Sequence, residues 1–160
     1  MSGNELKEFV PIKNKENGSL GKLKVANLNR VFNNGTASLM QLLETFSSVN
    51  TIYLRGNYFN DTFSTQDQLH VSSKIEELLL DRSSLNSNIL QSIGALTSLK
   101  ILSLSECGLS GALPTQGTLP SCLANLSSLH YLDISGNQFV GKGASTALAN
   151  LTLLRFISLS

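Results

Sequence analysis

Apolar residues recur along this chain in one phrase, and the period of its copies falls in the range typical of repeat proteins. Each copy reads apolar-x-x-apolar-x-apolar-x-x-(Asn or small polar)-x-apolar. The copies begin at Val49, Ile75, Leu99, Leu129 and Leu154, and the interval from Leu99 to Leu129 is the longest of the four. The second and third apolar positions are two residues apart, which is the side-chain period of a strand. Each copy therefore predicts one short strand.

A strand of this kind has one apolar side, which it cannot bury by itself. In the copy that begins at Leu129, Leu132 and Ile134 point to one side, whereas Tyr131 and Asp133 point to the other. Stacking the next copy on it pairs the strands in parallel and joins their apolar sides into one core. The phrase therefore predicts an α/β repeat solenoid. Its parallel strands would line a concave face, and 3₁₀ or irregular turns would line the convex face.

The ninth position of the phrase is where the chain turns away from the strand. It holds Asn57, Ser83, Cys107 and Asn137. An Asn amide can both donate to and accept from the backbone of the turn, whereas Ser and Cys each have a single donor. We expect a column of hydrogen bonds along the array that is weaker at Ser83 and Cys107.

A longer phrase identifies the type of repeat. Leu-x-Gly-x-Leu-Pro follows two residues after Cys107, and Pro120-x-x-Leu123-x-x-Leu126 leads into the next copy. The whole phrase, L-x-x-L-x-x-L-x-x-L-x-L-x-x-N-x-L-x-G-x-L-P, resembles the plant-specific leucine-rich repeat. Residues 96–160 look like the ectodomain of plant receptor-like proteins, and the resemblance covers roughly residues 20–160. It implies a leucine-rich-repeat horseshoe segment from a receptor with one transmembrane helix and a short tail that lacks a kinase.

The resemblance also implies what the chain does. It implies a non-enzymatic fragment that binds a peptide, glycan or protein ligand in defence or developmental signalling. The parent receptor would lie on the extracellular side of the plasma membrane and pair with a co-receptor kinase. A secreted inhibitor of polygalacturonase is the alternative, although the uneven intervals favour the receptor because the inhibitors resemble a more regular array. A truncated gene product with no independent function is a third interpretation.

The pattern also predicts how the chain is divided. Residues 20–160 are expected to form about five to six repeats, the first of them degraded (Leu23-x-x-Ala26-x-Leu28) and the last truncated. Residues 1–19 are expected to be a polar, mobile tail or a remnant. No apolar segment in residues 1–10 fits a signal peptide, and no run is long enough to span a membrane. The chain is therefore expected to be an internal piece of a longer receptor or the product of a truncated gene.

Residues 112–120 form an irregular junction. Two Leu-Pro pairs, at Pro114 and Pro120, lie six residues apart, where an intact array would separate them by about 24 residues. Either one strand-bearing repeat has been lost in frame, leaving ALPTQGTLP, or the extra six residues form a loop on the convex face.

Composition and motifs argue against other kinds of function. The net charge of +1 and the aromatic content of 6% are too low for a nucleic-acid-binding surface. His70 and His130 have no recognisable catalytic or metal-binding partners, and no phosphate-binding motif occurs. We expect no enzyme activity, no cofactor and no metal. Cys107 and Cys122 fall on different edges of a repeat, which favours two free thiols over a disulfide.

The strand pattern indicates which side chains face a ligand on the concave surface. Aromatic residues and Arg dominate binding hot spots, and the alternative is an ordinary solvated surface. The residues that we expect to contact a ligand are Tyr53, Arg55, Asp81, Arg82, Glu106 and Tyr131.

Five Asn-x-Ser/Thr sequons predict N-glycosylation, at Asn17, Asn34, Asn60, Asn125 and Asn150. Asn125 and Asn150 share one frame, four residues before the first Leu of a strand. A glycan at that edge would leave the concave face open. The alternative is that Asn simply suits the turn there.

Overall fold

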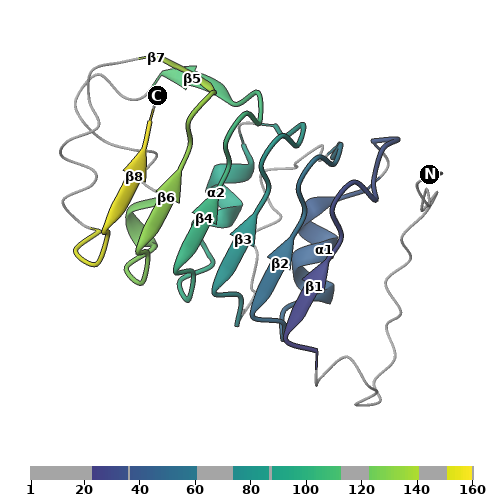
Figure 1. Ribbon diagram of the computed structural model, residues 1–160, viewed down its shortest axis with the longest axis horizontal. Coiled ribbons are helices and arrows are strands. Elements are labelled where there is room, and N and C mark those ends of the chain that lie inside the picture. The colour runs from purple at the N-terminus through teal and green to yellow at the C-terminus, as the bar shows by residue number, and fades with distance from the viewer. Residues whose placement is uncertain are drawn as a thin grey trace.

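Six short parallel strands form the main sheet. The structure, a computed structural model, describes residues 23–35, 37–60, 74–86, 88–112, 123–140 and 151–159. The strands stack in the order β1-β2-β3-β4-β6-β8 (Figure 1). Their bounds are Val25–Asn27 (β1), Thr51–Tyr53 (β2), Glu77–Leu79 (β3), Ile101–Ser103 (β4), Tyr131–Asp133 (β6) and Phe156–Ser158 (β8). The predicted repeat solenoid is confirmed.

The register is unbroken from β1 to β8. Ile101 of β4 lies opposite Tyr131 of β6, although the longest interval of the array separates these two strands in sequence. The longer interval is therefore accommodated outside the main sheet. The structure also contains a separate two-stranded sheet. In it, β5 (Ser110–Ala112) pairs in parallel with β7 (Gln138–Val140). Residues 113–120 of the predicted junction lie outside the described residues, so both interpretations of it stay open.

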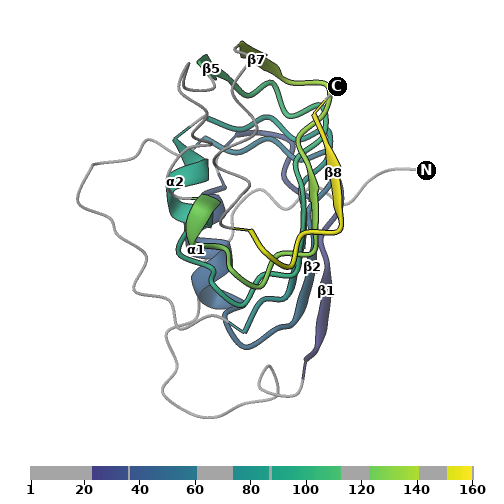
Figure 2. The ribbon, with the colours of Figure 1, turned by 90° about the vertical axis from the view of Figure 1, so that its left-hand side faces the viewer.

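Short helices carry the chain back from one strand to the next. They are α1 (Leu39–Thr45), α2 (Ile89–Ile93) and the 3₁₀ helix η2 (Leu123–Asn125). In Figure 2 the sheet lies on one side of the molecule and the helices lie on the other, with the core between them. The expected 3₁₀ turn is correct at η2. Elsewhere the convex side was predicted incompletely, because it includes two α-helices.

Local sequence explains the first of these helices. Ser38 caps α1, because its hydroxyl accepts a hydrogen bond from the Gln41 N–H at 3.4 Å. Leu39, Leu42 and Leu43 follow at helical spacing, and all three are buried. A spacing of three or four residues fits an α-helical turn as well as a 3₁₀ turn, so spacing alone did not distinguish them.

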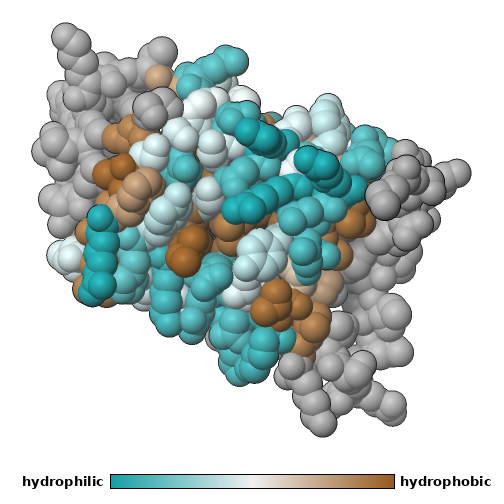
Figure 3. Space-filling model, viewed as in Figure 1, coloured by the Kyte–Doolittle hydropathy of each residue, from teal (hydrophilic) through white to brown (hydrophobic). Residues whose placement is uncertain are grey.

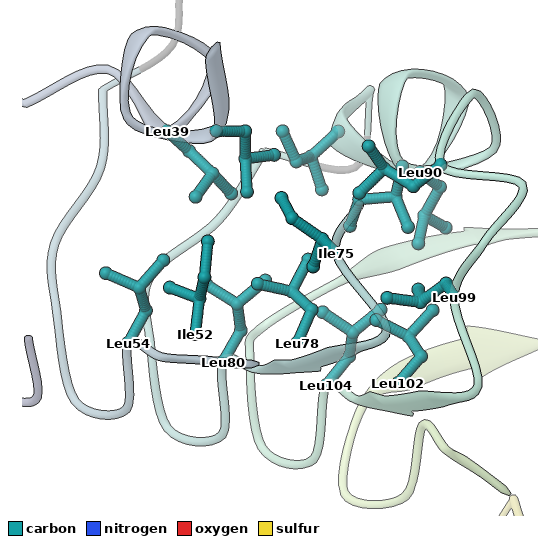
Figure 4. Close-up of a cluster of buried hydrophobic side chains, with 14 of the residues drawn as sticks. Leu39, Ile52, Leu54, Ile75, Leu78, Leu80, Leu90, Leu99, Leu102 and Leu104 are labelled. Carbon is teal, nitrogen blue, oxygen red and sulfur yellow. The ribbon is translucent and has the colours of Figure 1, made fainter. Parts of the chain in front are cut away.

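The core is a stack of aliphatic side chains between the sheet and the helices (Figure 4). Ile52, Leu78 and Leu102 lie opposite one another in successive strands, and each is at most 1% exposed. Burying such a side chain contributes about 1.5–3 kcal/mol. The inner positions of the phrase thus supply the continuous core that stacking requires.

The described residues do not reach every predicted feature. Residues 1–19 lie outside them, so the boundary of the array near residue 20 stays a prediction. Ala26 of the first, degraded copy does lie in a strand, β1, opposite Ile52. Among the described helices, none has the length and apolar run needed to cross a membrane.

Candidate binding face

The turn after each strand is held by the residue at the ninth position of the phrase. Asn57 is 3% exposed, and its Oδ1 accepts hydrogen bonds from the N–H groups of Val31 and Phe32, both at 2.8 Å. Its Nδ2 donates to the carbonyl oxygens of Leu28 at 3.0 Å and Leu54 at 2.6 Å. One side chain therefore satisfies four backbone groups and fastens its repeat to the preceding one.

Asn137 works in the same way. Its Oδ1 accepts hydrogen bonds from the N–H groups of Cys107 at 3.0 Å and Leu109 at 3.1 Å. Its Nδ2 donates to the carbonyl oxygens of Leu104 and Ile134, both at 2.8 Å. The two Asn residues of the column thus bridge adjacent repeats, as the sequence predicts.

Ser83 and Cys107 hold the same position with a single donor each. The Ser83 hydroxyl donates to the Leu54 carbonyl oxygen at 2.8 Å and accepts the Asn57 N–H at 3.1 Å. The Cys107 thiol donates to the Leu80 carbonyl oxygen at 3.2 Å. Burial raises the pKa of Cys107 to about 12, so the sulfur keeps the proton that this bond needs. The column is weaker at these two positions, as expected. Cys107 is a buried free thiol, and Cys122 lies outside the described residues.

A second column, one residue earlier, has left-handed backbone. The φ angles are 56° at Arg30, 67° at Gly56, 57° at Arg82, 55° at Glu106 and 65° at Gly136. For a residue with a Cβ this conformation costs roughly 1–2 kcal/mol, whereas Gly adopts it freely. Two repeats have Gly at this position and three have a charged residue, whose side chain lies at the end of the strand.

The outward side chains of the six strands, together with the residues just before each strand and in the turn after it, form one surface, which we call the strand face. It corresponds to the predicted concave face. Figure 3 looks onto it and shows hydrophilic residues gathered over the ends of the middle strands. The six predicted contact residues all belong to this surface. Tyr53 and Tyr131 lie in strands, and the other four lie in the turns that follow β2, β3 and β4.

Four of the six predicted contacts form two ion pairs between neighbouring repeats. Arg55 Nε lies 2.8 Å from Asp81 Oδ2. Arg82 and Glu106 make two contacts, at 3.2 and 3.3 Å, and their side chains are 72% and 55% exposed. Asp81 also accepts hydrogen bonds from the Ser103 hydroxyl and from the Ser105 N–H. Asp81 is thus engaged within the protein, whereas Arg82 and Glu106 are largely open to solvent.

The two predicted aromatic contacts have different surroundings. Tyr53 is partly exposed and lies opposite Leu79. Tyr131 stacks on Phe156, with ring centroids 4.4 Å apart and planes within 6°. Partial desolvation, together with the nearby Asp133 and Asp81 carboxylates, raises the pKa of Tyr131, so the phenol stays neutral at ordinary pH.

Four apolar residues of the strand face were not among the predicted contacts. They are Val25, Leu79, Ile101 and Phe156, of which Val25 is 50% and Phe156 is 45% exposed. The selection favoured Arg and Tyr in the middle of the chain. An apolar residue at an outward strand position is the sequence signal that would have found these four.

The predicted glycosylation sites are only partly described. Asn125 ends η2 and is exposed, and Asn34 and Asn60 are exposed as well. Asn17 and Asn150 lie outside the described residues. Glycosylation at all five sequons stays a prediction.

The described titratable residues offer no candidate metal centre. No group of three or more His, Cys, Asp or Glu residues lies close enough there to hold a metal ion. His130 Nδ1 makes a local hydrogen bond with the Ser128 carbonyl oxygen at 2.7 Å. His70 lies outside the described residues.

Comparison with known proteins agrees with the stacked strands. The Leucine Rich Repeat family matches residues 98–126 and 128–151. These matched residues of the chain are therefore similar to leucine-rich repeats. A tomato (Solanum lycopersicum) protein named Cuscuta receptor 1 is 36% identical to this chain over 96 residues. That alignment covers 48% of this chain and 9% of the tomato protein, so the chain corresponds to a small part of that relative. The resemblance to plant receptor-like proteins is thereby confirmed.

A comparison with solved structures found internalin C2 from Listeria monocytogenes. It aligns with 81% of this chain and 79% of its own length, at 19% identity and a TM-score of 0.29. The fold assignment rests on the strand register and on the family match.

Proposed function

We propose that this chain is part of the ligand-binding ectodomain of a plant cell-surface receptor-like protein. The strand face is the observation that carries the proposal, since it is one continuous surface built from repeats that resemble those of a named receptor. Its role is recognition of a peptide, glycan or protein ligand, and it is not catalytic. Binding by stacked repeats needs no chemistry beyond shape and polar complementarity.

The residues of the strand face have different roles in this proposal. Tyr53, Arg55, Arg82, Glu106 and Tyr131 contact the ligand. Asp81 acts as a positioning residue, because it fixes the direction of Arg55 and is held by donors from the next strand. A residue of this kind changes affinity through its partner rather than by direct contact.

The setting of the proposed receptor follows from the same resemblance. Its ectodomain lies outside the plasma membrane, carries N-glycans away from the strand face, and pairs with a co-receptor kinase in defence or developmental signalling. Exposed Asn125 on the convex side supports this arrangement, because a glycan there would not cover the strands. Treating the secreted chain with an N-glycosidase and comparing its mass with that of Asn125→Gln would test this part of the proposal.

Binding can be tested with a probe that the relative's name suggests, a soluble extract of Cuscuta. The secreted chain would be immobilised, and binding would be compared among the wild type, the double variant Tyr53→Ala/Arg82→Ala and the convex control Asn125→Gln. We expect the wild type and the control to bind alike and the double variant to bind more weakly. Equal binding by all three proteins would contradict the assignment of the strand face.

A further inference from the structure

Apolar side chains cross the strand face in a pattern that the predicted contacts did not include. Each strand from β2 to β8 in the main sheet presents two outward residues, of which one is polar and the other is apolar or aromatic. The pairs are Thr51 and Tyr53, Glu77 and Leu79, Ile101 and Ser103, Tyr131 and Asp133, and Phe156 and Ser158. The apolar members form what we call the apolar strip: Tyr53, Leu79, Ile101, Tyr131 and Phe156.

The register makes the apolar strip continuous. Tyr53 and Leu79 are opposite one another at the ends of β2 and β3. Ile101, Tyr131 and Phe156 are opposite one another at the starts of β4, β6 and β8. The strip therefore steps once, between β3 and β4. Four strand spacings of about 4.8 Å give it a length of about 19 Å. In Figure 3 apolar surface runs through the middle of this face between hydrophilic regions.

Ion pairs border the apolar strip on both sides. Lys100 Nζ lies 2.8 Å from Glu76 Oε2, just before the strands begin. The pairs of Arg55 with Asp81 and of Arg82 with Glu106 lie just after the strands end. Each pair joins opposite charges from adjacent repeats and so cancels its own charge. Two further carboxylates, Glu77 and Asp133, lie on the strands beside the strip, so an acidic ligand is disfavoured there.

We propose that the apolar strip binds an extended, apolar segment of about six residues, without acidic side chains, from a peptide or protein ligand. This inference rests on the proposed function and specifies its ligand. An extended chain advances about 3.3 Å per residue, so six residues match the length of the strip. The interior strands already pair on both sides, so the segment binds through side chains and not by adding a strand.

The width of the strip favours an extended segment over a helix. Each strand contributes only one apolar outward residue, so the strip is one side chain wide at every strand. A helix with side chains is about 10–12 Å in diameter and would also cover the bordering ion pairs. Covering those charges would add a desolvation cost that an extended segment avoids.

Panning a phage-displayed library of random linear peptides would test the proposal. Three proteins would be used: the wild type, the strip variant Leu79→Ser/Ile101→Ser, and the border variant Glu76→Gln/Lys100→Gln, which removes the one bordering pair that has no role as a predicted ligand contact. We expect the wild type to enrich peptides that lack acidic residues and have apolar residues at alternate positions. Affinity for a synthetic consensus peptide, measured by fluorescence anisotropy, should fall at least about tenfold in the strip variant and less than about threefold in the border variant. Matching circular dichroism spectra would show that both variants are folded.

Each of the following results would contradict a different part of the proposal. A charged consensus that depends on Glu76 and Lys100 but not on Leu79 and Ile101 would overturn the strip and leave the proposed function intact. Apolar residues at helical spacing would overturn the extended segment. If both variants bind the consensus peptide with unchanged affinity, the peptide binds elsewhere, and this result would contradict the assignment of the strand face as the binding surface. Failure of all three proteins to enrich any peptide would overturn the proposed peptide ligand.

Discussion

The turns that follow β2, β3, β4 and β6 are of two kinds. After β2 and β6 the chain has Gly-Asn, at residues 56–57 and 136–137, and we call these the Gly-Asn turns. After β3 and β4 it has Arg-Ser and Glu-Cys, at residues 82–83 and 106–107, and we call these the charged turns. All four turns have the same left-handed backbone at their first residue, with φ between 55° and 67°. The four turns therefore share a backbone conformation but differ in their side chains.

The charged turns are less stable locally than the Gly-Asn turns. Arg82 and Glu106 each bear a backbone cost of roughly 1 kcal/mol that Gly avoids. The exposed ion pair between them contributes only about 0–1 kcal/mol of stabilisation. Ser83 and Cys107 also make fewer hydrogen bonds than the Asn residues do. The middle repeats thus lose stability where they gain charged side chains beside the apolar strip, a cost that the proposed binding role would explain.

Removing an Asn from a Gly-Asn turn should have the largest effect. Asn57→Ala is expected to lower the free energy of unfolding by about 3 kcal/mol, because it leaves buried backbone groups without partners. Cys107→Ala, the matched change in a charged turn, should cost about 1 kcal/mol. Urea denaturation would measure both. Equal losses would show that the two kinds of turn do not differ in the way described.

Adding a methyl group to a Gly-Asn turn should come next. Gly136→Ala places a Cβ at φ 65° and only 2.8 Å from Glu106 Cγ, so we expect a loss of about 2 kcal/mol. In a Glu106→Ala background the same change should cost about 1 kcal/mol, because the contact is gone and only the backbone cost is left. A loss that is the same in both backgrounds would exclude the contact with Glu106.

The pH dependence of stability should separate Cys107 from the Asn positions. Its pKa rises from 9.0 in the unfolded chain to about 12 in the folded protein, so the folded state holds the proton more tightly. The contribution of this shift to the free energy of unfolding is therefore complete below pH 9 and is lost as pH rises toward 12. By about pH 10 the wild type should lose about 1 kcal/mol more than Cys107→Ser does. Denaturation at several alkaline pH values would measure the difference, and parallel curves would contradict the shift.

The smallest effect on stability should be a gain. Arg82→Gly removes the backbone cost but also removes the exposed ion pair. We therefore expect the free energy of unfolding to rise by about 0.5 kcal/mol. Arg82→Ala keeps the backbone cost and should show no gain. Both variants should bind the ligand of the strand face more weakly, by about 1–2 kcal/mol. A change that raises stability and lowers affinity would confirm that Arg82 is retained for binding.

The fold was predictable because its signal is periodic. Leu78 and Leu80 occur at fixed distances from their counterparts in other copies, so strand position and register follow from counting. The Asn column was predictable for the same reason. Helix α2 (Ile89–Ile93) was not, because a single turn of apolar residues does not distinguish an α-helix from a 3₁₀ helix.

The position of the strand face was predictable, but the contacts between its side chains were not. Arg55 and Asp81 were both selected as ligand contacts, yet their pairing depends on side-chain directions in two different repeats. The stacking of Tyr131 on Phe156 depends in the same way on the register across the β6–β8 pair. Such contacts arise only after the repeats are assembled.

The direct pairing of β4 with β6 has an evolutionary consequence. The long interval between these two strands leaves the sheet in the same phase as the shorter intervals before it. Each strand of a repeat array contacts only its neighbours, so a duplication, deletion or unequal crossover that preserves the strand phrase disturbs only one junction. Such an event changes the order of the outward side chains along the sheet and leaves the stacking of the strands unchanged. Genes of this kind can therefore diversify by exchanging whole repeats, and recognition can change faster than the fold that supports it.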